Sequence, residues 1–214
     1  MVFVRIIVLV FSFALVACGG GQTPTVSSGT PAPTTTAATP TAATQTAATG
    51  ATTALACTSP AQSMVELTEG PYYKAGAPQR TSLMATGVSG TPLALTGYVV
   101  SRSCQPVANA KLDFWQADGG GNYDNSGYTL RGWQLTDANG AYRLDTVIPG
   151  LYPGRTEHIH VKVTVNGKTY TSQLFFPGVS QNAGDSIYSS QMLVKLNTST
   201  TPATATFTFV VNIA

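Results

Sequence analysis

The chain has only two histidines, and they lie two residues apart, at His158 and His160. Tyr152 precedes His158 by six residues, and Arg155 precedes it by three. Imidazole nitrogens and phenol oxygens bind transition metals, and a guanidinium group stabilises negative charge. The stretch from Tyr152 to His160 therefore holds the residue types of a metal-dependent active site within nine residues.

Residues 158–165 read HIHVKVTV, so apolar side chains at odd positions alternate with polar side chains at even positions. This period of two predicts a β-strand with one face in the core. Since the isoleucine and the valines take the core face, we expect His158 and His160 to project together from the polar face. Two side chains placed in this way on one strand can bind one metal ion.

Asn166-Gly167 follows this strand, and Asn-Gly is the strongest short signal for a β-hairpin. If these two residues are the whole loop, Val165 lies opposite Lys168 and His160 lies opposite Gln173. The register therefore predicts that Gln173 lies beside His160 on the same face of the sheet.

Two histidines exclude a three-histidine site within one chain, so any further ligand has to supply oxygen. One alternative is a site of two histidines and one carboxylate, with the carboxylate from Asp118, Asp124, Asp137 or Glu157. The other alternative uses the nine tyrosines, of which Tyr152 is the nearest in sequence before the pair. Phenolate is a hard anionic ligand, and two phenolates with one hydroxide balance the charge of Fe(III).

The elements that must position these residues are short strand-like runs between Gly, Pro and Asn turns, without sustained helical periodicity. This pattern predicts an all-β fold, a β-sandwich of mixed and antiparallel strands. The predicted strands are Leu95–Val100, Lys111–Gln116, Tyr142–Val147, Ile159–Val165, Thr169–Phe176, Met192–Leu196 and Thr204–Ile213.

Residues 1–18 are predicted to be a lipoprotein signal peptide. Arg5 precedes the apolar run 6–16, which is shorter than the roughly 20 residues that span a bilayer and is typical of an export signal. The sequence LVAC, followed by Gly19, resembles a bacterial lipobox, in which Cys18 becomes lipidated. We therefore expect an exported lipoprotein, held at the cell envelope by this lipid anchor, on its periplasmic or extracellular face.

Residues 19–56 contain no charged and no aromatic residue, which predicts a disordered tether rich in Thr, Ala and Pro. Residues 57–214 form the predicted folded domain. Its two cysteines, Cys57 and Cys104, are expected to form a disulfide outside the cytoplasm. The net charge of +2 gives no reason to expect a nucleic-acid partner.

Four segments, TEGPYYKAGAPQR, LDFWQADGGGNY, LRGWQLTDANGAYRLDTVIPGLYPGRTEHIHVKV and SQLFF, resemble the intradiol ring-cleavage dioxygenases, above all their extracellular subgroup. The resemblance runs in order from about residue 67 to residue 176. It implies the prealbumin-like β-sandwich of that family and one non-haem Fe(III) ion. The ligands that it implies are Tyr123, Tyr152, His158 and His160.

The resemblance also implies a role for each residue around the iron. Tyr152 is the ligand that the substrate displaces, and its phenolate takes a substrate proton. Arg155 stabilises negative charge on the bound substrate. Gln173, Pro71 and Tyr72 contribute to the substrate pocket.

The implied reaction uses O2 to cleave a small aromatic diol of the catechol type between its two hydroxyl-bearing carbons, giving a cis,cis-muconate-type product. Tyr128 is the local alternative to Tyr123 as the first tyrosine ligand. Leu151 departs from the aromatic residue that extracellular relatives often carry before the second tyrosine. A metal-free prealbumin-like module for surface binding or structure is the alternative function, and the oligomeric state and the particular catechol stay open.

Overall fold

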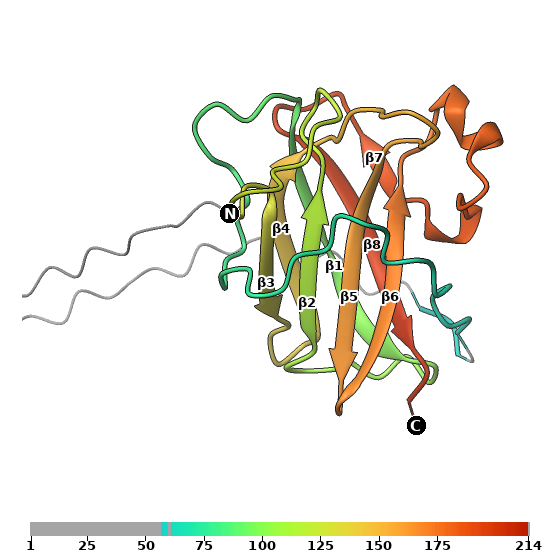
Figure 1. The fold of residues 1–214 in the computed structure, drawn as a ribbon. Coiled ribbons are helices and arrows are strands. Elements are labelled where there is room, and N and C mark those ends of the chain that lie inside the picture. The colour runs from blue at the N-terminus through green and yellow to red at the C-terminus, as the bar shows by residue number, and fades with distance from the viewer. Residues whose placement is uncertain (1–56, 60, 214) are drawn as a thin grey trace, which may run out of the picture. The chain divides into compact units, whose positions relative to one another are not determined.

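The computed structural model describes residues 57–59 and 61–213, which form two four-stranded sheets packed face to face (Figure 1). The all-β sandwich predicted from the sequence is therefore confirmed. The predicted signal peptide 1–18 with Cys18, and the predicted tether 19–56, lie outside the described residues. Across the described residues no helix has the length and apolarity needed to cross a membrane.

The two sheets differ in how their strands are ordered. The first sheet has the order β4-β1-β8-β7 and contains a parallel pair, β1 with β8. Its strands are β1 (Pro92–Ser101), β4 (Ala141–Val147), β7 (Lys195–Asn197) and β8 (Ala203–Val211). The second sheet has the order β3-β2-β5-β6 and is antiparallel throughout. Its strands are β2 (Lys111–Gln116), β3 (Arg131–Leu135), β5 (His158–Val165) and β6 (Lys168–Phe175).

Most predicted strands agree with these bounds to within a few residues. The prediction of a strand over Met192–Leu196 is wrong for its first part, because Met192 ends the 3-10 helix η2 (Ser190–Met192) and only Lys195–Asn197 pairs as β7. A second 3-10 helix, η1, spans Ser180–Gly184. Strand β3 was not predicted, because its sequence RGWQL lacks the apolar alternation that marks a half-buried strand.

The core lies between the sheets, and β5 shows how the sequence builds it. Ile159, Val161 and Val163 are fully buried on the inner face, as the alternation predicts. Asn166 and Gly167 both have positive φ, 51° and 79°, the requirement of a type I′ turn. The predicted register is confirmed, since Val165 pairs with Lys168 and His160 pairs with Gln173.

The segment before β1 crosses the outer face of the second sheet, in teal in Figure 1, strand by strand. Leu67 donates its backbone N–H to the carbonyl of Thr171 in β6, at 2.8 Å. Further along, Gly70 lies against His160 of β5, and the Tyr73 ring packs on Trp115 of β2 with centroids 4.8 Å apart. The segment therefore covers one end of this outer face.

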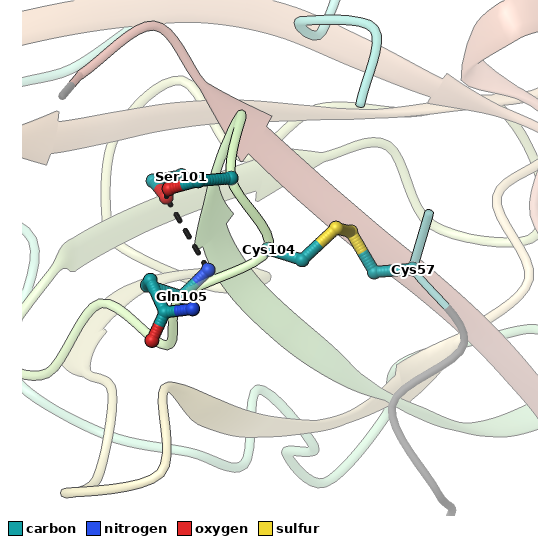
Figure 2. The surroundings of a disulfide bond; sticks show 5 residues. Cys57, Ser101, Cys104 and Gln105 are labelled. Atoms are coloured by element: carbon teal, nitrogen blue, oxygen red, sulfur yellow. Dashed lines mark hydrogen bonds between the residues drawn. A yellow bond between two sulfur atoms is a disulfide. The ribbon is translucent and has the colours of Figure 1, made fainter. Parts of the chain in front are cut away.

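A disulfide fixes the start of the described domain. Cys57 is bonded to Cys104, which lies 47 residues further along in the turn after β1 (Figure 2). In the same turn the backbone N–H of Gln105 donates to Oγ of Ser101 at 3.3 Å. The sequence prediction paired the same two cysteines.

Candidate metal centre

One row of side chains crosses the outer face of the second sheet, with one residue from each strand. The strand register aligns them in the order Arg131, Trp115, His160 and Gln173. All four are buried, with at most 2 % of their surface exposed. The next row along the sheet, which contains Lys162 and Thr171, is partly exposed. Burial on this outer face therefore increases toward the histidines.

Both histidines lie on the outer face of the sheet, as the alternation predicts. This face carries polar side chains, but it is not exposed to solvent at the histidines. His158 and His160 are 2 % and 1 % exposed. The Trp115 ring stacks on the His160 ring with centroids 4.7 Å apart and planes 9° apart. On the segment that crosses the sheet, a Cβ atom on Gly70 would lie 3.4 Å from Cε1 of His160. The site is thus enclosed by its own chain.

Three donor atoms converge at the amino end of β5. Nε2 of His158 lies 3.1 Å from Nε2 of His160 and 3.3 Å from the hydroxyl oxygen of Tyr152. Nδ1 of His158 is 2.6 Å from the carbonyl oxygen of Thr156. A carbonyl can only accept, so Nδ1 carries the proton and Nε2 offers its lone pair to the site.

Tyr123 joins this group from the loop between β2 and β3. Its ring stacks on Tyr72 with centroids 4.3 Å apart and lies edge-on to Tyr152 at 5.7 Å. Its hydroxyl oxygen is buried and has no hydrogen-bond partner of normal geometry among the described residues. Tyr128, the local alternative, points away and donates to the carbonyl of Ala75 at 2.8 Å. The structure therefore brings Tyr123 to the histidines, and not Tyr128.

Glycines allow the two loops that carry Tyr123 and Tyr152 to pack closely, backbone against backbone. A Cβ atom on Gly121 would lie 2.1 Å from the carbonyl oxygen of Leu151, and a Cβ atom on Gly150 would lie 2.3 Å from that of Gly119. Gly150 also donates its N–H to the carbonyl of Asp118 at 2.8 Å. Only glycine permits this approach of two backbones, so the GGGN run places Tyr123 beside the turn that carries Tyr152.

Tyr152 and Arg155 are brought together by the turn between them. The backbone N–H of Arg155 donates to the carbonyl of Tyr152 at 3.0 Å, and Gly154 has φ of 77°. Pro153 followed by a glycine with positive φ is the sequence of a type II turn. The turn places Nη1 of Arg155 3.4 Å from the hydroxyl oxygen of Tyr152.

Arg155 is held by two further side chains. Its Nε donates to Oδ2 of Asp185 at 2.9 Å, and its Nη2 donates to Oε1 of Gln173. Gln173 in turn donates to the carbonyl of Thr68 at 2.9 Å. Asp185 was not predicted as a site residue, because it lies 30 residues from Arg155 and belongs to no motif. Its carboxylate also accepts the backbone N–H groups of Thr156 and Ile187, at 2.9 and 2.8 Å.

Burial sets the protonation of these groups. Burial, together with the smaller effect of the neighbouring Arg155 charge, lowers the pKa of His158 to about 4. The pKa of His160 is also well below its usual value, again chiefly through burial. Burial raises the pKa of Tyr123 well above its usual value, helped by the nearby phenol of Tyr152, whose own pKa is raised by burial. Both imidazoles are therefore neutral at pH 7, which leaves them free to bind a metal ion.

The spacing of the donor atoms fits one metal ion. Two ligand atoms that bind an ion at about 2.1 Å, at a right angle, lie about 3.0 Å apart. The contacts of 3.1 and 3.3 Å around His158 Nε2 match that spacing. The buried Tyr123 hydroxyl has no hydrogen-bond partner among the described residues and is available as a fourth donor. In the described part of the chain no three His, Cys, Asp or Glu side chains gather into a metal-binding group. The carboxylate alternative therefore has no support, and the tyrosines are the remaining oxygen donors.

A pocket of about 330 Å³ opens onto this group. Tyr152 and Arg155 line it, together with Leu151, Gly154, Gln181, Gly184 and Asp185. A small aromatic ring can reach Tyr152 through this opening. The site thus combines two buried imidazoles, two phenols, a guanidinium and an entrance for a ligand.

Three comparisons with known proteins agree on the family. A family model described as dioxygenase matches residues 68–212, most of the described domain. The protocatechuate 3,4-dioxygenase beta chain of Burkholderia cepacia is 31% identical over 103 residues, which are 39% of this chain and 44% of that protein. The matched part thus spans less than half of that relative.

The solved structures are similar over a larger share of the chain. The dioxygenase domain of a dioxygenase carbohydrate-binding protein fusion from Streptomyces sp. SirexAA-E is 44% identical, with a TM-score of 0.69, over 72% of this chain and all of that one. The 3-chlorocatechol 1,2-dioxygenase from Rhodococcus opacus 1CP is 26% identical, with a TM-score of 0.65, over 71% of this chain and 73% of that one.

The chain belongs to the intradiol ring-cleavage dioxygenase family. In this member of the family, the residues that the resemblance suggested do not all lie equally close to the histidines. Tyr72 stacks on Tyr123, and Gln173 binds Arg155. Pro71 is exposed, and Leu151 is 40 % exposed at the pocket entrance. Pro71 lies in the segment that covers His160 but not in the lining of the pocket beside Tyr152, and its role in substrate binding stays a prediction.

Proposed function

We propose that this protein is a non-haem Fe(III) dioxygenase that cleaves a catechol-type ring between its two hydroxyl-bearing carbons with O2. The product is a cis,cis-muconate-type diacid. The observation that carries the proposal is that His158 Nε2 lies 3.1 Å from His160 Nε2 and 3.3 Å from the Tyr152 hydroxyl oxygen. The Tyr123 ring lies edge-on to Tyr152, and its buried hydroxyl has no hydrogen-bond partner among the described residues. A metal-free surface module gives no account of this convergence.

Tyr123, Tyr152, His158 and His160 would hold the iron. When bound, Fe(III) would withdraw electron density from a chelated catecholate and make its ring open to attack by O2. Because burial keeps both phenols protonated, loading the site releases their protons. The two imidazoles are already neutral and need no deprotonation.

Tyr152 is the residue placed to exchange a proton with the substrate. It lines the pocket that also contains Arg155, whereas Tyr123 is not part of that lining and stacks on Tyr72. An incoming catechol therefore meets the hydroxyl oxygen of Tyr152 first, and the phenolate there can accept a proton from a catechol hydroxyl.

Arg155 is placed to stabilise the negative charge that develops on the substrate. Its Nη1 lies 3.4 Å from the Tyr152 hydroxyl oxygen, and a charged donor beside developing negative charge lowers the barrier. Gln173 and Asp185 hold the guanidinium in this position. The segment carrying Tyr72 covers the histidines and so keeps water away from them.

The test is oxygen uptake by iron-replete protein against a panel of catechols, with identification of the product by mass spectrometry. We expect one O2 consumed per catechol and both of its atoms in the ring-opened diacid. Phenolate bound to Fe(III) also gives a red-brown colour. Colourless iron-replete protein, or a product opened beside the diol instead of within it, would contradict the proposal.

Two tyrosine variants sharpen this test. Tyr123→Phe removes a proposed ligand and should weaken the visible band and lower the rate at least about 100-fold, the usual scale for a lost catalytic contact. Tyr128→Phe is the matched control, since Tyr128 lies in the same loop but binds Ala75. It should keep both colour and rate. The reverse result would assign the ligand to Tyr128.

We also propose that the protein acts at the cell envelope, anchored through a lipid on Cys18. The Cys57–Cys104 disulfide supports an oxidising compartment. Membrane fractions should contain the full chain, and the Cys18→Ser variant should move to the soluble fraction. Equal membrane association of both would refute the lipid anchor.

A further inference from the structure

The pocket beside Tyr152 contains two charged side chains that neutralise each other. Of the residues that line it, only Arg155 and Asp185 carry charge, and Nε of Arg155 lies 2.9 Å from Oδ2 of Asp185. Their side chains are 13 % and 2 % exposed, so water screens this pair little. The pocket lining therefore has no net charge.

Each of the three nitrogens of the guanidinium already has a partner, which accounts for three of its five N–H groups. Nε binds Asp185, Nη2 binds Gln173, and Nη1 points to the Tyr152 hydroxyl at 3.4 Å. Arg155 therefore acts toward the reacting end of a bound ring and not toward the entrance. The rest of the lining is uncharged and consists of Leu151, Tyr152, Gly154, Gln181 and Gly184.

A ring substituent at the entrance would meet these residues. A carboxylate there would lose part of its hydration and find no free cation, and the carboxylate of Asp185 would repel it. An uncharged substituent would lose little hydration and could pack on Leu151, which is 40 % exposed.

We infer that Asp185, by occupying Arg155, makes this site select catechols with uncharged ring substituents over carboxylated ones. The inference rests on the proposed ring-cleaving function and names the substrate class within it. Asp185 also fixes the position of Arg155, but that role alone would affect both classes of catechol equally. The relative named protocatechuate 3,4-dioxygenase matches only 39% of this chain, so its carboxylated substrate does not decide the matter.

The experiment measures binding to the iron-replete full chain at pH 7 without O2, by calorimetry. The two probes are 3,4-dihydroxybenzoate and 3,4-dihydroxybenzamide, which have nearly the same shape and differ by one charge. Wild-type protein should bind the amide more tightly. Asp185→Asn keeps the side-chain shape and one oxygen, which can accept either the Thr156 N–H now on Oδ2 or the Ile187 N–H now on Oδ1, and should shift the affinity ratio toward the benzoate by about tenfold.

Asp145→Asn is the matched control, because Asp145 also pairs with an arginine, Arg143 at 2.7 Å, but on the other sheet. It should leave the ratio unchanged. Where Asp185→Asn does not fold, Gln181→Lys adds a cation at the exposed entrance and should shift the ratio in the same direction. The inference is overturned if wild-type protein prefers the benzoate, or if both variants keep the wild-type ratio.

Binding without O2 separates this inference from the proposed function. Preferred binding of the amide with no product in air would count against ring cleavage and support the selection. Cleavage of both probes with the benzoate preferred would support the function and overturn the selection.

Discussion

Each sheet carries on its outer face a row of four side chains with an arginine at one edge. In the second sheet the row consists of Arg131, Trp115, His160 and Gln173, all at most 2 % exposed. In the first sheet the aligned row consists of Arg143, Thr96, Thr206 and Lys195, all exposed or half-buried. The two rows have the same strand geometry but differ in exposure. The buried row of the second sheet is called the covered row below, and the exposed row of the first sheet is called the open row.

The difference comes from what lies over each row. Over the second sheet, Gly70 contacts His160 and Tyr73 packs on Trp115. Burial then shifts the pKa values of the histidines downward and keeps them neutral. Strand alternation therefore determines which residues share a face, and the covering segment turns one such face into a reactive site.

The largest expected effect is the loss of the metal from the covered row. His160→Ala removes one of two imidazole ligands, and we expect iron binding and ring cleavage to fall below detection. Thr206→Ala changes the corresponding position of the open row and should keep both. Iron content by emission spectrometry and the visible absorption band measure the outcome.

Circular dichroism would establish that both variants fold. If folded His160→Ala kept full iron and colour, the ligand assignment would be wrong. If Thr206→Ala lost iron as well, the two rows would not differ in the way proposed.

Local signals predicted the part of the site that lies on β5 and β6. Alternation placed His158 and His160 on one face, and the Asn166-Gly167 turn placed Gln173 opposite His160. Both signals act between residues that are close in the sequence, because strand pleating and a two-residue turn leave one register.

Contacts between distant parts of the chain were not predictable in this way. The stack of Tyr72 on Tyr123 and the pair of Arg155 with Asp185 join segments that no local pattern connects. Tyr123 was assigned by family resemblance, whereas Asp185 has no sequence signal. The burial of His158 also depends on distant segments, because alternation alone predicts a polar and therefore open face.

The second prediction concerns the arginine at the edge of each row. Arg131 donates to the carbonyl of Asp124 from Nε and Nη2, at 3.2 and 3.0 Å, and to that of Tyr72 from Nη1, at 2.5 Å. It therefore ties together the two segments whose tyrosines stack. Arg131→Met leaves these carbonyls without donors and should lower the free energy of unfolding by roughly 4 kcal/mol.

Arg143→Met is the matched change in the open row. Its ion pair with Asp145 is exposed, so the change should stay within about 0.5 kcal/mol. Urea unfolding of iron-free protein at pH 7 compares the two. Equal destabilisation would mean that the covering segment does not depend on Arg131.

The smallest expected effect is a pH dependence of stability from His160 in the covered row and from His158 beside it, whereas the aligned row of the first sheet contains no histidine. The pKa of His158 is about 4 in the folded protein, chiefly through burial, and near 6.5 when unfolded. As pH falls from about 6.5 to 4, His158 binds a proton in the unfolded chain but stays largely unprotonated in the folded protein. The folded state should then lose up to about 3 kcal/mol through His158.

The lowered pKa of His160 acts in the same direction. Urea unfolding of iron-free protein at several pH values would measure the slope. His158→Gln keeps a polar side chain but cannot titrate, so the difference in stability between this variant and wild type should shrink or change sign as pH falls from 6.5 to 4. Asp185 acts in the same direction at the acid end of this range, because hydrogen bonds from Thr156, Ile187 and Arg155 outweigh its burial and keep its pKa below the usual value. It is present in both proteins, so its contribution cancels in their comparison. Parallel pH profiles for variant and wild type would show that the covering segment leaves His158 accessible to protons, and would remove the main electrostatic distinction between the outer faces of the two sheets.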